Sequence, residues 1–177
     1  SIIMPWTNYH NHCHYCDGAM NIEDHILAAI EQEVFSFAMS CHAPVPATTK
    51  WNMKEQDLGT YIDELKRLRS KYRNQIEVYT SLEIDYIPGY VEPRHALFQS
   101  QDLDFTIGSV HCLGDAKRGL LWEMDGSHKG FQACLRHFYD GDSKKLVNDY
   151  FKVTRHMIRT FNPDIVGHFD KIRMQNI

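Results

Sequence analysis

Histidines and acidic residues recur along this chain in, or just after, short apolar runs. The candidates occupy five segments and are His10, His12, Asp17, His42, Glu83, His111 and His168. Imidazole and carboxylate groups are the ligands that zinc, iron and manganese take in proteins. The set is large enough for two or three divalent ions. The residue types therefore predict a metal-dependent hydrolase.

The first segment places two histidines at alternate positions. On a strand, the rings of His10 and His12 would lie on one face and form a two-nitrogen platform. Asp17 precedes Gly18 in a predicted turn, from which its carboxylate can reach a neighbouring ion. His14 continues the same alternation and is an alternative to Asp17. A lone His-x-His pair is more often surface or core histidine, so the prediction depends on the later segments.

Each later segment could also have a purely structural role instead of binding metal. His42 ends an apolar run and could be a capped core histidine, while Glu83 could form an ion pair with an arginine. An acid in a buried strand is costly unless it is paired or bound to metal. A glutamate can also bridge two cations, as two-metal hydrolysis requires. Gly167 before His168 indicates a close backbone approach, and His111 again follows a strand.

Strands and helices are expected to alternate. Strands are predicted at 6–11, 34–40, 76–84, 103–110 and 165–167, and helices after the N-cap Asn21 and at 57–73, 91–101, 129–139 and 143–161, with loops at 43–53 and 111–127. This order implies a parallel sheet. Side chains at the carboxyl ends of such strands converge at one end of an α/β barrel. A closed barrel usually needs roughly 200–250 residues, so we expect the C-terminal two or three units to be missing.

Composition excludes several classes of protein. The chain has 177 residues, for which one domain is expected, and 43% of them are hydrophobic. Lys and Arg number 19 against 23 Asp and Glu, without a basic run, so no nucleic-acid partner is expected. No apolar stretch is long enough for a membrane span, and Ser1–Trp6 has no signal-peptide features. Five cysteines, an odd number, favour reduced thiols and a cytoplasmic location.

One motif leaves an alternative open. Cys13 and Cys16 form a C-x-x-C pair. A structural zinc site would need a second such pair, and the sequence has none. A redox motif should open a helix after a strand, and this context is roughly present.

Taken in order, the segments resemble the motifs of the polymerase-and-histidinol-phosphatase (PHP) family. These motifs are His-x-His with a following Asp-Gly, a strand-terminal His, a Glu, another His and a Gly-His. Gly108–His111, Trp122, Asp125 and Gly167–Asp170 resemble the histidinol-phosphate phosphatase branch most. The resemblance implies a distorted (β/α)7 barrel with two or three divalent metals (Zn, Fe or Mn). It also implies hydrolysis of L-histidinol phosphate to L-histidinol and phosphate, in histidine biosynthesis.

The resemblance also implies the distribution of ligands. His10, His12 and Glu83 would hold one metal, Asp17 and His42 a second, and Glu83, His111 and His168 a third. The late Asp-x-His motif of the family has no counterpart after Asp170, so the first two sites would each lack a ligand. Candidate phosphate-binding cations are Arg118, Arg159 and Lys171, with Lys117, Arg155 and Arg173 as alternatives; each could instead be a solvated surface charge.

Two other functions remain open. One is a phosphodiesterase or nuclease-like hydrolase of the same family, against which the absence of a basic stripe argues mildly. The other is an inactive, truncated barrel that binds metal and self-associates through an unpaired strand edge. The main hypothesis has a small phosphorylated substrate as its partner and no membrane partner.

Overall fold

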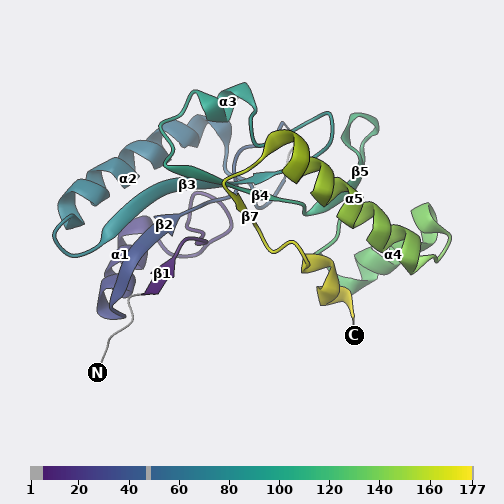
Figure 1. Ribbon diagram of the computed structural model, residues 1–177, viewed down its shortest axis with the longest axis horizontal. Coiled ribbons are helices and arrows are strands. Elements are labelled where there is room, and N and C mark those ends of the chain that lie inside the picture. Colours follow the sequence, from purple (N-terminus) through teal and green to yellow (C-terminus); the bar gives the residue numbers. More distant parts are fainter. Residues whose placement is uncertain (1–5, 47–48, 177) are drawn as a thin grey trace. The chain divides into compact units, whose positions relative to one another are not determined.

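The computed structural model describes residues 6–46 and 49–176 (Figure 1). Its elements are β1 (Trp6–Asn8), α1 (Ile22–Glu31), β2 (Val34–Met39), η1 (Glu55–Asp57), α2 (Leu58–Tyr72), β3 (Glu77–Asp85), α3 (Ala96–Gln99), β4 (Phe105–Ser109), β5 (Cys112–Asp115), η2 (Ala116–Arg118), β6 (Leu120–Glu123), α4 (His128–Tyr139), α5 (Ser143–Phe161), β7 (Ile165–Val166) and η3 (Lys171–Gln175), where η marks a 3-10 helix. The segment Ser1–Trp6 and the loop 43–53 lie partly outside the described residues.

The chain divides into two compact units. The first comprises residues 1–84 and 96–107, and the second comprises residues 85–95 and 108–177. The first unit therefore holds β1, β2, nearly all of β3 and the start of β4. The second holds the end of β4 together with β7.

Strands of the first unit follow the order β1-β2-β3-β4. β1 and β2 are parallel, with Thr7 beside Ser36, and β2 and β3 are parallel, with Met39 beside Thr80. The helices α1 and α2 make the two crossover connections that parallel neighbours require. The predicted parallel pairing of these three strands is confirmed.

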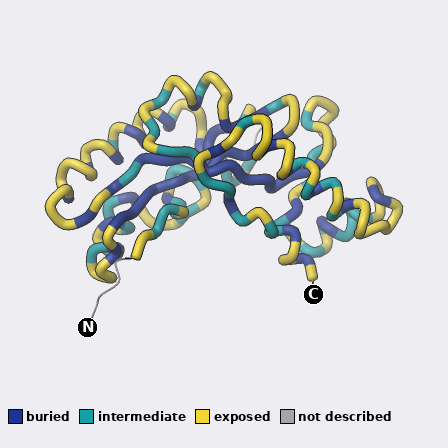
Figure 2. Tube along the Cα trace, in the orientation of Figure 1, coloured by how far each residue is buried: buried dark blue, intermediate teal, exposed yellow. Residues whose placement is uncertain are grey.

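Helix α2 packs across two strands of this sheet. Its buried residues recur at helical spacing and are Leu58, Tyr61, Ile62, Leu65, Leu68 and Tyr72. The hydroxyl of Tyr61 lies 3.0 Å from the carbonyl oxygen of Met39 in β2 and 2.7 Å from that of Ser81 in β3. In Figure 2 the strands are mostly buried, whereas exposed and buried residues alternate along the helices. This pattern is typical of helices that cover a sheet.

The opposite face of the sheet carries the polar residues. Alternate residues of β3 share one face, so Ser81, Glu83 and Asp85 point the same way. All three are buried. At the other end of this face, the ring of Tyr9 packs against Phe105 with centroids 5.7 Å apart. The acidic residues therefore lie at the carboxyl end of β3, as predicted for a site in this fold class.

The second unit has its own core. Buried members include Tyr86, Val110, Met124, Leu146, Tyr150 and Met157. Its strands meet where the amide of Gly167 donates to the carbonyl of Gly108, at 2.9 Å. A Cβ on Gly108 would lie 2.8 Å from the side chain of Pro163, so the packing of Pro163 against this strand requires glycine. Helix α5 has the bounds predicted from the sequence, and Asp142 caps its start through the amide of Lys145.

Three predicted elements differ from the structure. The expected loop at 111–127 contains the antiparallel hairpin β5–β6. Gly119, with a φ angle of 69°, lies in the connection between the two strands, whereas Gly114, with a φ angle of 118°, lies within β5. The first strand ends at Asn8 instead of residue 11. The helix predicted at 91–101 is reduced to Ala96–Gln99, because Pro93 disfavours the helical conformation of Glu92, the residue before it.

Among the described residues, no helix is both long and apolar enough to cross a membrane.

Candidate metal centre

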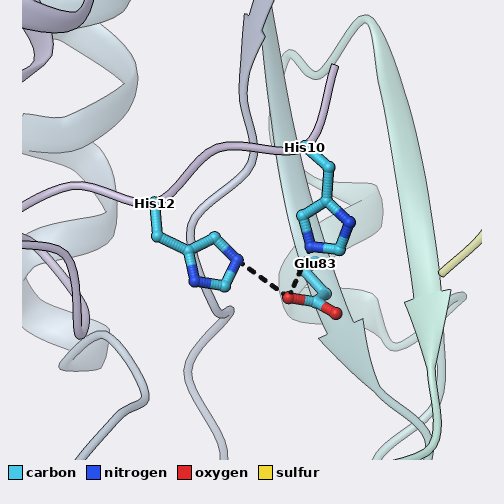
Figure 3. Close-up of side chains that lie close together, drawn as sticks. All are labelled: His10, His12 and Glu83. Atoms are coloured by element: carbon cyan, nitrogen blue, oxygen red, sulfur yellow. Dashed lines mark hydrogen bonds and ion pairs between the residues drawn. The ribbon is translucent and has the colours of Figure 1, made fainter. Parts of the chain in front are cut away.

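Two histidines of the first unit converge on one carboxylate oxygen. The Nε2 atoms of His10 and His12 lie 3.0 Å and 2.9 Å from Oε2 of Glu83. Figure 3 shows both rings reaching from the same segment toward Glu83 on β3. The Glu83 side chain is fully buried, so its charge requires compensation. Atoms that bind one ion at about 2.1 Å lie roughly 3 Å apart when their directions are perpendicular, and both nitrogen–oxygen distances match this spacing.

Asn11, between the two histidines, orients this segment. Its backbone amide bonds Oγ of Ser40 at 3.0 Å, and its side-chain amide donates to the carbonyl of Ala38 at 2.9 Å. The amide of Ser40 returns a bond to the carbonyl of Asn11 at 2.9 Å. We expected the histidines to lie on the first strand itself, which is wrong. Asn11 instead anchors an irregular segment against β2, and its two neighbours point toward Glu83.

Asp17 and His42 complete this group. Oδ1 of Asp17 lies 2.8 Å from Nδ1 of His12, and its Oδ2 lies 3.7 Å from Nε2 of His42. Nδ1 of His42 is 3.5 Å from Oε2 of Glu83. His42 is held beside Glu83 by a parallel bridge, in which the amide of Glu83 donates to the carbonyl of Cys41 at 3.0 Å. The structure thus brings together all five ligand candidates of the first unit.

A tight turn presents Asp17 to His12. The amides of Cys16 and Gly18 both donate to the carbonyl of Cys13, at 3.0 Å and 3.1 Å. A Cβ on Gly18 would lie 2.4 Å from the carbonyl oxygen of His12, so only glycine allows this approach. His14, the alternative to Asp17, is exposed, and its ring packs on Tyr15.

The first cluster favours positive charge. Burial alone would lower the pKa of His12, but its hydrogen bond with Glu83 and the charges of Cys16, Glu83 and Asp17 raise it from 6.5 to about 9. Burial also opposes ionisation of Asp17, yet the charges of His42 and His12 lower the pKa of this carboxyl. The negative charge of these acids stabilises a proton on the neighbouring imidazole, and it would stabilise a bound metal cation in the same way. The donor set therefore fits a divalent ion.

The sequence interpretation missed Cys16 as a neighbour of these ligands. Its sulfur lies within 4.8 Å of ligand atoms of His12 and Asp17. The hydrogen bond with Cys41 lowers the pKa of the Cys16 thiol to about 7, although burial opposes this. Sγ of Cys13, in contrast, lies 3.1 Å from Sγ of Cys41. Both sulfurs of the C-x-x-C pair are therefore turned toward Cys41.

The second unit holds candidate ligands of its own. Nε2 of His111 lies 3.3 Å from Nε2 of His168, and Nδ1 of His111 bonds the carboxylate of Asp85. Two imidazole nitrogens bound to one tetrahedral zinc at about 2.0–2.1 Å would be about 3.3 Å apart. The pair therefore has the spacing of two zinc ligands. The predicted third set, which adds Glu83 to these histidines, draws on both units and stays a prediction.

Asp85 is a site residue that the sequence interpretation did not select. The signal was available, because Asp85 follows Glu83 by two residues and alternate strand residues share a face. Asp85 and His111 are each 4% exposed. The amide of Tyr86 donates to the carbonyl of Ser109 at 2.8 Å, and this bond sets the end of β3 beside the residues that lead to His111.

The three predicted cations differ in their surroundings. Arg118 and Arg159 are exposed, on η2 and α5 respectively. Nζ of Lys171 lies 3.2 Å from Oδ2 of Asp125, and the backbone amide of Lys171 donates to the carbonyl of His168 at 2.9 Å. Lys171 is therefore the one of the three that the structure ties to a predicted ligand.

Comparison with known proteins identifies the family of this chain. The model of the PHP domain family matches residues 8–177. The chain belongs to the PHP domain family. Its parallel strands agree with this assignment.

Curated relatives of this PHP domain carry phosphatase names. A "Probable histidinol-phosphatase" of Schizosaccharomyces pombe is 28% identical over 180 residues, which cover 96% of this chain and 56% of the relative. Another of the same name, from Deinococcus radiodurans, is 27% identical over 167 residues, covering 91% and 59%. The chain thus spans less than two thirds of the length of these relatives.

Solved structures confirm the fold. A Listeria monocytogenes structure, provisionally assigned as a histidinol phosphatase, has a TM-score of 0.74 at 21% identity, covering 96% of this chain and 67% of that one. The histidinol phosphate phosphatase of Lactococcus lactis, solved with zinc, L-histidinol and phosphate, has a TM-score of 0.67 at 19% identity, covering 96% and 59%. The predicted α/β fold of the PHP type is confirmed.

Proposed function

We propose that this PHP domain belongs to a metal-dependent phosphomonoesterase that hydrolyses L-histidinol phosphate to L-histidinol and phosphate. Support comes from the names of its curated relatives and from the zinc, L-histidinol and phosphate bound by the Lactococcus lactis protein. The observation that carries the proposal is the convergence of His10 and His12 on one oxygen of the buried Glu83.

The described residues suggest a division of roles. We propose that His10, His12 and Glu83 hold one divalent ion and that Asp17 and His42 hold a second, with His111 and His168 contributing to a third. Imidazole with carboxylate suits zinc, iron or manganese. Bound divalent ions would neutralise phosphoryl oxygens and activate water for attack on phosphorus.

The chain's own side chains would orient these donors and the substrate. Asp17 accepts from Nδ1 of His12, which leaves Nε2 of that ring directed at Glu83. A carboxylate in this position fixes the tautomer and the ring orientation of a ligand histidine. Among the predicted cations, we propose Lys171 as the contact for the phosphate, because its backbone is bonded to His168.

The test is phosphate release by the intact, metal-loaded protein from L-histidinol phosphate, beside cleavage of a phosphodiester. We expect monoester hydrolysis that is lost in Glu83→Gln and retained in Glu77→Gln, which changes an exposed glutamate of the same strand. Preferential diester cleavage would favour the nuclease-like alternative. Metal binding without either activity would refute the proposed reaction and favour a metal-binding fragment.

A further inference from the structure

The carboxylate of Asp85 is directed at a histidine. It is bonded to Nδ1 of His111, and both side chains are about 5% exposed. A carboxylate buried to this degree needs a partner that donates hydrogen bonds. His111 supplies that partner from the segment after β4, so the pair joins the last residue of β3 to that segment, and both residues belong to the second unit.

The direction of this bond decides what the other ring nitrogen can do. In a neutral imidazole one nitrogen donates and the other accepts. A carboxylate accepts, so the Nδ1 atom that faces Asp85 carries the hydrogen and Nε2 keeps its lone pair. Nε2 of His111 is the atom that lies 3.3 Å from Nε2 of His168. The two rings therefore meet through the nitrogen that Asp85 leaves available for a ligand.

We infer that Asp85 is a positioning residue, which fixes His111 in the Nδ1–H tautomer so that its Nε2 can bind a metal ion together with His168. The inference rests on the metal centre proposed above. It assigns to Asp85 a role toward His111 that matches the role of Asp17 toward His12, whose Nδ1 and carboxylate oxygen are 2.8 Å apart. In each unit a carboxylate would thus orient a ligand histidine.

The local backbone supports this role. The amide of Tyr86, next to Asp85, donates to the carbonyl of Ser109 at 2.8 Å, and the amide of Met124 donates to the carbonyl of His111 at 2.7 Å. Asp85 and His111 are therefore both held by their neighbours' hydrogen bonds. A ligand that is pre-oriented in this way loses less freedom when it binds an ion. Removal of such a partner typically weakens metal binding 10–100-fold.

The experiment uses Asp85→Asn and Asp85→Ala in the intact protein, with Asp104→Asn as the matched control. Asp104 is a carboxylate that accepts a backbone bond, from the amide of Thr80 at 2.7 Å, and it pairs with Arg69 instead of a histidine. Zinc affinity is measured by competition with a chromophoric chelator. Long-range proton–nitrogen NMR of the metal-free protein reports which ring nitrogen of His111 carries the hydrogen. Circular dichroism shows whether each variant is folded.

We expect the Nδ1–H tautomer in the wild type and in Asp104→Asn. Both Asp85 variants should lose this preference, and one zinc equivalent should bind about 10–100-fold more weakly. An Nε2–H tautomer in the wild type would overturn the inference, and so would wild-type zinc affinity in Asp85→Asn. If Asp85→Ala does not fold, the near-isosteric Asn variant decides. Absence of phosphatase activity in a zinc-binding wild type would refute the proposed reaction without affecting either readout.

Discussion

Replacement of Glu83 by glutamine tests the centre of the first cluster. The change keeps the shape of the side chain and removes one negative charge, at an atom 2.9–3.0 Å from two ring nitrogens. Two unit charges about 4 Å apart interact by about 4 kcal/mol at an effective dielectric constant of about 20. Since about 1.4 kcal/mol is a factor of ten in a binding constant, we expect zinc affinity to fall about a thousandfold.

The assay is chelator competition on the intact protein, with metal content per chain measured by elemental mass spectrometry. Glu77→Gln is the matched control, because Glu77 lies on the same strand and is exposed. The wild type and this control should retain the tight equivalent that Glu83→Gln loses. Equal zinc affinity in all three proteins would refute the reasoning, because it would show that no ion binds at the oxygen on which the histidines converge.

Three further predictions concern stability and pH. Tyr61→Phe removes a buried hydroxyl that lies 2.7 Å from the carbonyl of Ser81, so the free energy of unfolding in urea should fall by about 1–3 kcal/mol; an unchanged midpoint would contradict this. Gly18→Ala places a Cβ 2.4 Å from the carbonyl oxygen of His12, so the free energy of unfolding should fall by about 1–3 kcal/mol. In the control Gly59→Ala the new Cβ meets nothing within 4 Å, so the free energy of unfolding should not fall measurably. In metal-free protein the pKa of His12 is raised from 6.5 to about 9, so its contribution of about 3 kcal/mol is present below pH 6.5 and is lost as the pH rises through 9. The same pH dependence of unfolding in His12→Gln would refute the assignment.

Local sequence patterns predicted many of the helices and strands. The helix at Ser143–Phe161 could be bounded because its apolar stripe, its N-cap and its exit lie within one stretch of sequence. Asn21 likewise caps α1 as predicted, since its side-chain oxygen accepts from the amide of Asp24 at 2.8 Å. The hairpin β5–β6 could not be recognised in the same way. Its strands have four residues each and are defined by their pairing with each other.

The candidate site shows the same division. Residue types and strand-end positions identified the histidines and Glu83, because a buried strand tolerates an acid only with a partner. Asp85 was not selected, although its spacing from Glu83 places it on the same face of the strand; the structure shows which histidine it meets. The first strand was also predicted to be longer than it is. The bonds that hold its extension are made by the side chain and backbone of Asn11, and a periodicity argument does not see them.

The sequence by itself determined the chemistry that is available: imidazoles and carboxylates at the ends of apolar strands, in an order that resembles one family. Only the tertiary structure decided which nitrogen meets which oxygen. His12 and Glu83 are 71 residues apart in the chain, and Asp85 and His111 are 26 apart. Such contacts depend on strand pairing, and the contact between Asp17 and His12 depends on the close approach that Gly18 permits. Tautomers and local charge follow from these distances, so no local reading of the sequence contains them.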